Sequence, residues 1–231
     1  TPTESIREME TEPERGPDEE LAANNVLMSG NMEFKNGEKY PVFDTPLYRD
    51  EIVSITFLYT LDDVPGNAWD ISELQNGSVL AWAVPNGKYY DLYIAGEGGV
   101  SAPEKCIRMF AMYENLEQIS FNDCFFTSGT NSMKLMFHAC SSLQELDLSC
   151  FDTSYVTSMQ QMFDYCTNLR SVDVSSFDTS NVMFMNYMFY ECPNLKYLDL
   201  SNFDLSGVRY YDGFMSKGAL LNGEPWMEVF E

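Results

Sequence analysis

The C-terminal half of the chain repeats itself in the lines MFHACSSLQELDLSCFDTSYVTSMQQ (136–161), MFDYCTNLRSVDVSSFDTSNVMFMNY (162–187) and MFYECPNLKYLDLSNFDLSGVRYYDG (188–213). Each line starts with Met-Phe and carries a cysteine, a leucine-rich segment, an aspartate and a second phenylalanine in the same order. The preceding line, MFAMYENLEQISFNDCFFTSGTNSMKL (109–135), has the same order but is one residue longer. A fixed period of this length indicates stacked structural units, here with a degenerate first copy.

Two hydrophobic periods alternate within each line. Leu195, Leu198 and Leu200 follow the spacing LxxLxL, whose end has the two-residue period of a short strand. The Phe-Asp-Thr-Ser segment offers side-chain oxygens that cap helices, and apolar residues then recur at steps of three and four. The sequence therefore predicts a strand, a turn and a helix in each repeat. The predicted helix face of one repeat consists of Val182, Met185, Met188, Phe189 and Cys192.

Such a unit cannot bury its apolar face alone, whereas stacked copies share one core and one parallel sheet. We therefore expect an α/β fold over residues 106–215, a leucine-rich-repeat solenoid of strand-turn-helix coils with a degenerate first coil and three regular coils.

The pattern MFxxCxxLxxLDLSxFDTSxVxxM resembles the repeats of BspA-like leucine-rich-repeat proteins found on bacterial surfaces. The upstream segments WDISELQNGSVLAWAV and DLYIAGEGGVSAPEKC also resemble the region that precedes such repeats. The chain departs from the pattern at Leu205, at Gly207 and in the segment Phe121-Asn122-Asp123-Cys124, and atypical end repeats are expected where a stack must be capped. The resemblance implies an extracellular protein of the bacterial cell surface that binds or adheres.

The residues outside the repeats divide into three regions. Residues 1–20 are rich in carboxylates and poor in large apolar side chains, which predicts a disordered acidic spacer. Residues 21–105 lack the repeat and predict a β-rich cap that covers the apolar end of the first coil; an independent ligand-binding module is the alternative. Residues 216–231 predict a C-terminal cap, with Trp226 over the open core.

Within the N-terminal cap region, Ile52–Tyr59 is rich in β-branched and aromatic residues and predicts a strand. The runs Val79–Val84 and Tyr89–Ile94 bracket Pro85-Asn86-Gly87-Lys88, which predicts a β-hairpin.

Thirty-six acidic residues against thirteen basic ones give a formal net charge of −23. This charge repels phosphate backbones and anionic lipid headgroups, so nucleic acids and membrane surfaces are poor partners. Since no apolar run is long enough to span a bilayer, we expect no membrane insertion. A cationic partner, a divalent ion and simple solubility all remain open.

The residues that most enzymes need are scarce. His138 is the only histidine and stands at a variable repeat position, so we expect it on a solvated helix surface rather than in a catalytic pair. The segment Gly96-Glu97-Gly98-Gly99 lacks the spacing of a phosphate-binding loop and predicts a turn. We therefore expect no enzyme and no cofactor.

The cysteines fall into two sets. Cys140, Cys166 and Cys192 lie on the predicted helix face, where they form a ladder of small buried side chains. No closely spaced pair suggests a zinc site, so no metal is expected. Cys124 and Cys150 also lie one repeat apart, and a disulfide between neighbouring coils is left open.

Acidic and variable positions supply the candidate binding surface. Asp147, Asp173 and Asp199 alternate with inward residues, so they predict an outward row of carboxylates that serine hydroxyls or backbone N–H groups compensate, with calcium as the alternative. A second row of aspartates lies in the predicted turn after the strand, where aspartate commonly forms turns and caps helices, so we expect a structural role for it. The second row consists of Asp152, Asp178 and Asp204. The expected contact residues are Arg170, Lys196 and Tyr197, together with the first row of aspartates.

These patterns favour a monomeric, non-catalytic surface protein that binds an extracellular protein or glycan through its exposed sheet. One alternative is a purely structural stalk or cap segment of a larger envelope protein. Another is a carboxylate-dependent glycan hydrolase, which requires two acids about 5 to 9.5 Å apart beside a cleft.

Overall fold

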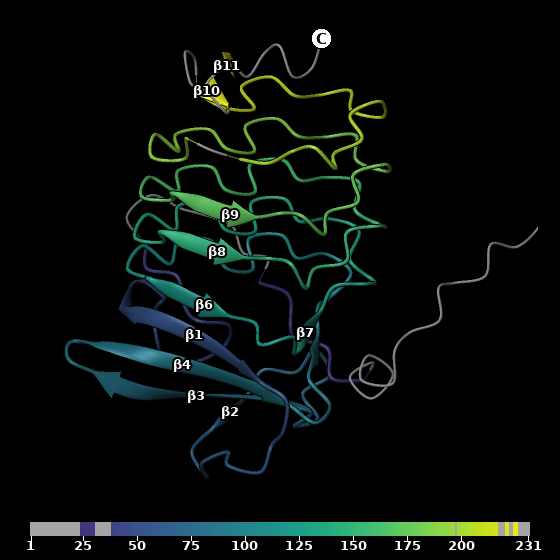
Figure 1. The fold of residues 1–231 in the computed structure, drawn as a ribbon. Helices are drawn as coiled ribbons and strands as arrows, with labels where there is room; N and C mark the ends of the chain where they lie inside the picture. The colour runs from purple at the N-terminus through teal and green to yellow at the C-terminus, as the bar shows by residue number, and fades with distance from the viewer. Residues whose placement is uncertain (1–23, 31–37, 197, 217–219, 222–223, 226–231) are drawn as a thin grey trace, which may run out of the picture.

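The computed structural model describes residues 24–30, 38–196, 198–216, 220–221 and 224–225 (Figure 1). The predicted acidic spacer and Trp226 therefore lie outside the described residues. A mixed sheet forms the N-terminal end, and successive layers of chain are stacked above it. The elements are η1 (Arg49–Glu51), β1 (Ile52–Leu58), β2 (Trp69–Asp70), β3 (Val79–Asn86), β4 (Tyr89–Gly96), β5 (Val100–Ser101), β6 (Gln118–Ser120), β7 (Phe125–Phe126), β8 (Glu145–Asp147), β9 (Ser171–Asp173), β10 (Leu220–Leu221) and β11 (Glu224–Pro225).

The N-terminal sheet has the strand order β2-β3-β4-β1-β6. Its centre is the predicted hairpin, in which β3 and β4 pair antiparallel from Val79↔Gly96 to Asn86↔Tyr89. Gly87, in the two-residue connection, has a φ of 63°, which glycine adopts without steric cost. The predicted strand at Ile52 is β1, which pairs parallel with both β4 and β6. The sequence interpretation of both features is confirmed.

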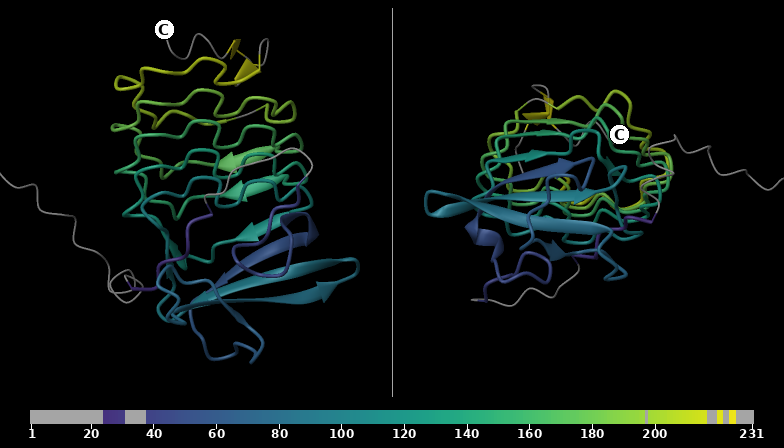
Figure 2. Two further views of the ribbon diagram at one scale, coloured as in Figure 1. Left: turned by 180° about the vertical axis from the view of Figure 1, so that it is seen from behind. Right: turned by 90° about the horizontal axis from the view of Figure 1, so that it is seen from below.

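The sheet does not end at residue 105, because β6 belongs to the degenerate first repeat. The next repeats continue beside it, where β8 and β9 pair parallel and in register, with Asp147 opposite Asp173. On another side of each layer, parallel bridges join Ser132 to Ser158, then to Phe184 and to Tyr210. Seen along the stack, the layers nearly superpose (Figure 2).

The expected α/β leucine-rich-repeat solenoid of strand-turn-helix coils is wrong. The only helix among the described residues is the short 3-10 turn η1, so the fold is nearly all-β, with one mixed sheet and several two-stranded sheets. The segment predicted to be helical is a series of turns in which Gln161 and Tyr165 both have positive φ. Its backbone N–H groups alternate between two kinds of acceptor. The Met162 N–H donates to the carbonyl of Met159 in the same layer, and the Phe163 N–H donates to the carbonyl of Met188 in the next layer. An α-helix would bond each of them four residues back in its own segment.

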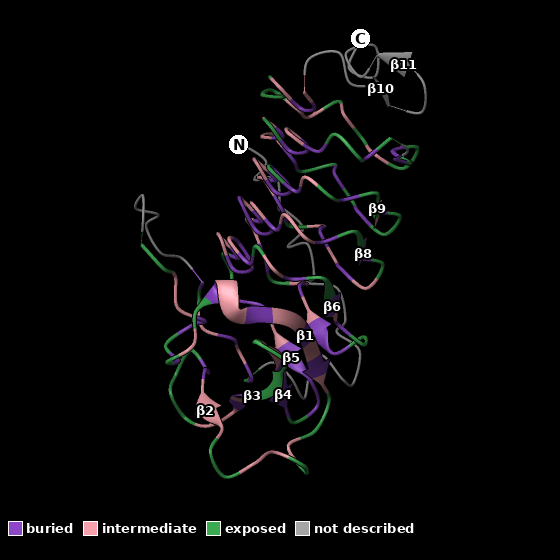
Figure 3. Cartoon of the chain, turned by 90° about the vertical axis from the view of Figure 1, so that its left-hand side faces the viewer, coloured by how far each residue is buried: buried purple, intermediate pink, exposed green. Residues whose placement is uncertain are grey.

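The predicted helix-face residues are buried although no helix carries them. Consecutive turns that return the chain inward every three or four residues bury the same positions as a helix face. Figure 3 shows this distribution, with exposed residues on and beside β8 and β9 along one side of the stack. The buried residues of that face are Val182, Met185, Met188, Phe189 and Cys192.

One continuous apolar cluster runs from Leu27 to Met215, through the N-terminal sheet and all layers. Repeated positions stack on themselves in it: the ring centroids of Phe137 and Phe163 lie 5.6 Å apart, and those of Phe163 and Phe189 lie 5.0 Å apart. Phenylalanine recurs at these positions because each ring packs on the equivalent ring one layer away.

Buried polar side chains also bridge the layers. The Thr153 hydroxyl donates to the carbonyl of Asp178 at 2.9 Å, and the Cys166 thiol donates to the carbonyl of Phe137. Each such bond satisfies a polar group that stacking removes from water. No helix in the described part of the chain is long and apolar enough to cross a bilayer.

Candidate binding surface

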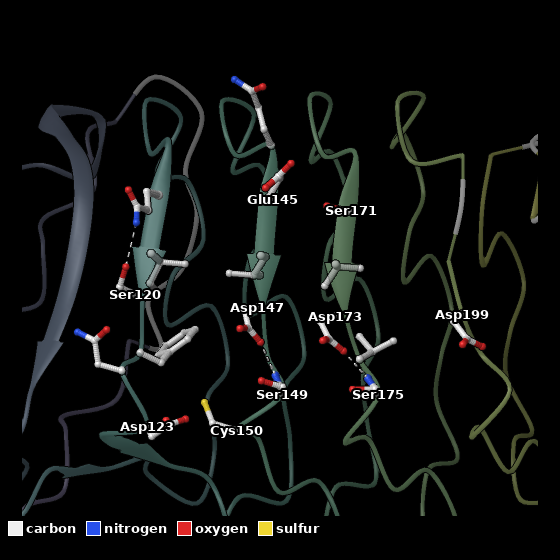
Figure 4. A pocket seen from close by; sticks show the side chains of 18 of the residues that line it. Ser120, Asp123, Glu145, Asp147, Ser149, Cys150, Ser171, Asp173, Ser175 and Asp199 are labelled. Atoms are coloured by element: carbon white, nitrogen blue, oxygen red, sulfur yellow. Dashed lines mark hydrogen bonds between the residues drawn. The ribbon is translucent and has the colours of Figure 1, made fainter.

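An open groove lies over β6, β8 and β9 and the segments that follow them (Figure 4). Its walls consist of carboxylate, amide and hydroxyl side chains above buried residues such as Leu146. None of the described residues that line it is Lys, Arg or His. The carboxylates of this acidic groove belong to Glu117, Asp123, Glu145, Asp147, Asp173 and Asp199.

The row of aspartates in the groove is held by one repeated turn. Oδ1 of Asp147 accepts the N–H of Ser149, Asp173 accepts that of Ser175 and Asp199 accepts that of Ser201, each at 2.9 Å. The expected compensation of these carboxylates by turn N–H groups is confirmed. All three aspartates are exposed, so the turns hold a regular row of carboxylates at the groove surface.

These turns also favour the charged form of two of the aspartates. Hydrogen bonds from Ser149 lower the pKa of Asp147, and hydrogen bonds from Ser201 lower the pKa of Asp199. A carboxylate with a lowered pKa is ionised near neutral pH. Among the described residues, no group of three or more His, Cys, Asp or Glu side chains is arranged to hold a metal ion.

The second row of aspartates makes the same turn elsewhere. Oδ1 of Asp152, Asp178 and Asp204 accepts the N–H of the residue two positions later, again at 2.9 Å. The predicted turn role is confirmed, whereas the predicted helix-cap role is wrong because no helix follows. None of the three lines the acidic groove.

The other predicted contact residues are not part of this groove. Arg170 and Lys196 are exposed but do not line it, and Tyr197 lies outside the described residues. Glu117 and Asp123 do line it and were missed. Both belong to the degenerate first copy: the repeat aligns Glu117 with Gln144 of the next line, whereas Asp123 lies where the extra residue interrupts the pattern.

The prediction that His138 lies on a solvated helix surface is wrong. It occupies a turn, and its Nδ1 is 3.4 Å from Oδ2 of the buried Asp164. The Gln161 amide donates to the same carboxylate oxygen at 2.8 Å.

Aromatic rings also gather outside the groove, and Tyr165, Tyr187 and Tyr210 among them are exposed. The Tyr165 and Tyr190 centroids lie 6.4 Å apart, those of Tyr190 and Tyr187 lie 5.4 Å apart, and Phe184 stacks on Tyr210 at 4.9 Å. We call these five residues the aromatic strip. The three residues Tyr165, Tyr187 and Tyr190 lie in turns, Phe184 and Tyr210 pair in a parallel bridge, and none of the five lines the acidic groove.

The cysteines are all free thiols. Cys140, Cys166 and Cys192 are buried, and each donates to the carbonyl of a phenylalanine one layer before it. Burial raises the pKa of Cys140 to about 12, so the thiol rather than the thiolate is present in this ladder.

Comparison with known proteins identifies one family. The model of the family described as "Mycoplasma protein of unknown function, DUF285" matches residues 104–225, which is more than half of the chain. The family is associated with BspA-like repeat proteins. Neither a curated protein nor a protein of solved structure matches the chain.

Proposed function

This chain belongs to the DUF285 family, and we propose that it is a non-catalytic binding module of a bacterial cell surface whose acidic groove takes a cationic segment of an extracellular protein. The observation that carries the proposal is the row formed by Asp147, Asp173 and Asp199, which one repeated turn holds exposed and in register.

Charge and preorganisation support a cationic ligand. Strand neighbours are spaced by about 4.8 Å, so like charges in the row repel one another. The Ser149 turn stabilises the ionised form of Asp147 without neutralising it, since an N–H donor carries no net charge. A lysine or arginine side chain that bridges two layers relieves this repulsion, and no side chain has to be reoriented for it to bind.

The same features argue against hydrolysis in the groove. A glycan hydrolase needs one carboxyl group that stays protonated to serve as the acid. The lowered pKa values of Asp147 and Asp199 favour the opposite state. The groove is also open, whereas a hydrolase encloses its substrate between two acids.

The proposal is tested by titrating the protein with an oligo-lysine peptide and an oligo-glutamate peptide, using calorimetry at several salt concentrations. We expect only the cationic peptide to bind, and its affinity to fall as salt rises. The double variant Asp147→Asn/Asp173→Asn keeps the turn acceptors but removes two groove charges, and we expect about tenfold weaker binding, or ~1.4 kcal/mol.

The matched control is Asp178→Asn/Asp204→Asn, which makes the same change of charge in the same turn outside the groove. We expect its affinity to stay close to that of the parent chain. Equal losses in both double variants would indicate attraction by net charge alone. No binding to cationic peptides or to extracellular proteins would favour the purely structural stalk or cap.

The aromatic strip favours a glycan as the second candidate partner. Sugar rings pack their apolar faces on exposed aromatic rings, and the phenol hydroxyls supply hydrogen bonds. Tyr165 is 48% exposed and Tyr210 is 49% exposed. On a glycan array, Tyr165→Ala/Tyr210→Ala should lose any glycan signal while Tyr155→Ala, outside the strip, keeps it; a signal unchanged by the double variant rejects this site.

A further inference from the structure

We propose that Cys124 and Cys150 form a disulfide between the first two layers when the protein meets a disulfide oxidant. The pair lies at the edge of the acidic groove, where Cys150 is one of the lining residues.

The two cysteines occupy equivalent positions of adjacent layers. Cys124 precedes Phe125 and Cys150 precedes Phe151, and these two rings lie 5.9 Å apart. Three residues after Cys124, the Thr127 hydroxyl donates to the carbonyl of Asp152 at 2.8 Å. The extra residue of the first copy is absorbed before Cys124, where Asn122 and Asp123 both have positive φ.

The register places the two backbones within reach of a disulfide. Neighbouring strands lie about 4.8 Å apart, and disulfides join residues whose Cα atoms are about 4.4 to 6.8 Å apart.

The side chain at this repeat position points toward the preceding layer. In the second regular repeat, the Ser176 hydroxyl donates to the carbonyls of Leu148 and Phe151, one layer before it. Asn202, one layer later, donates in the same direction to the carbonyls of Ser175 and Phe177. Cys150 stands at the same position, and its sulfur lies on the side of Asp123, the neighbour of Cys124 (Figure 4).

Access separates Cys150 from the other cysteines, all of which are buried. Cys140 and Cys166 are fully buried and have no exposed surface for an oxidant. Cys150 is only partly buried and lines the groove, so a small disulfide molecule can reach its sulfur. Cys106 has no cysteine at the equivalent position of the next layer, which is occupied by Met133.

The chemistry is thiol–disulfide exchange with oxidised glutathione as the oxidant. The Cys150 thiolate attacks the glutathione disulfide, forms a mixed disulfide and releases one glutathione thiolate. The Cys124 thiolate then attacks the Cys150 sulfur and releases the second glutathione. Two protein thiols are oxidised, one small disulfide is reduced to two thiols, and both protein protons pass to solvent or to glutathione.

Burial determines the rate of this exchange. It raises the pKa of Cys150 to about 11, with a further contribution from the charge of Asp123. Thiolate is therefore scarce at neutral pH, and we expect the oxidation rate to rise about tenfold per pH unit between pH 7 and pH 9.

The test is to incubate the native chain with oxidised glutathione at pH 8.5, denature it in an alkylating reagent, and analyse intact mass and linked peptides. We expect four of the six thiols to remain and one cross-link, between Cys124 and Cys150. The oxidised protein should melt several degrees higher than the reduced one, because the bond constrains the unfolded chain.

The control is Cys150→Ser, which installs the residue that the next layer carries as Ser176. This variant should form no intramolecular cross-link. Cys124→Ser should give the same result, so the test does not depend on the folding of a single variant. Six free thiols in oxidised native protein, a stable glutathione adduct on Cys150 without a cross-link, or a bond between Cys140 and Cys166 would each overturn the proposal.

Discussion

Arg49 is fully buried and faces backbone carbonyls rather than a carboxylate. Its Nη1 donates to the carbonyls of Arg108 at 2.8 Å and Ala111 at 2.7 Å, and its guanidinium lies 5.1 Å from the ring centre of Tyr113. Later in the stack the equivalent carbonyl, that of His138, accepts the N–H of Met112 from the layer before it. Among the described residues no repeat layer precedes the first one, so the guanidinium takes the place of the missing donor.

Replacing Arg49 with Met keeps the apolar stem but removes the donor to the Ala111 carbonyl, whereas the Arg108 carbonyl still accepts the Ala111 N–H. An unsatisfied buried acceptor costs about 1 to 3 kcal/mol, so we expect a loss of this size in the free energy of unfolding. Urea unfolding followed by circular dichroism measures it. The control Arg209→Met removes an exposed arginine and should change stability little; equal losses would contradict the capping role.

Asp70 shows how single residues produce pH dependence. Burial alone would raise its pKa, but hydrogen bonds from Ser72 and the Gly77 N–H lower it overall. A carboxyl group whose pKa is lower in the folded state stabilises the fold above its unfolded pKa of about 3.9, and this contribution is lost as pH falls through the folded value.

We therefore expect the melting temperature of the parent chain to fall more steeply between pH 5 and pH 3 than that of Asp70→Asn. Calorimetry across this range measures both curves. The variant should melt lower than the parent at pH 7, and the two should converge in acid. Parallel curves would show that the Ser72 and Gly77 bonds do not favour the charged carboxylate.

At the scale of elements, strands were predictable and the turn segments were not. A two-residue period specifies a strand face, which is why Leu146 and the Asp147 row are placed correctly. The three- and four-residue steps of the following segment fit a helix and consecutive turns equally well. The positive φ values at Ala139, Tyr165 and Glu191 show that the segment forms turns. These positions carry neither glycine nor asparagine, the residues that usually indicate this conformation in a sequence.

The substitution Ala139→Gly distinguishes the two conformations. Ala139 has a φ of 58°, so glycine relieves strain there, and we expect stability to rise by about 0.5 to 1 kcal/mol. In a helix the same change would cost about 1 kcal/mol. Chemical denaturation gives the sign directly, and Ala111→Gly, at a position without positive φ, should destabilise. A destabilised Ala139→Gly would contradict the turn conformation.

The groove was predictable to the same extent as the repeat. Asp147, Asp173 and Asp199 follow from the period, because the regular layers superpose. Asp123 does not, since the extra residue of the first copy changes which side chain meets the groove. Arg170 and Lys196 were chosen as variable positions beside the strand and as residue types common at interfaces. Neither lines the groove, although Gln144, at the same repeat position as Arg170, does.

At the scale of the molecule, the N-terminal sheet and the repeats form one structure. The parallel pairing of β1 with β6 joins them, and Phe57 packs on Phe110, Phe121 and Phe125 of the first repeat. Parallel pairing between segments some sixty residues apart leaves no local sequence signal, so the sequence predicts that a cap exists but not how it is attached.

This continuity predicts a single cooperative unfolding transition for the parent chain, and failure of the repeats to fold without the N-terminal sheet. A chain that begins at residue 106 exposes the Phe110 and Phe121 rings, leaves β6 without β1, and loses the Arg49 donor to the first layer. A stack depends on its neighbouring layers for stability, so unfolding of the uncovered first layer exposes the next in turn. Urea unfolding of the parent chain, followed by fluorescence and by circular dichroism, should give two coincident curves, whereas the shortened chain should lack a cooperative transition. A shortened chain that unfolds cooperatively at the parent midpoint would show that the sheet is a separate unit.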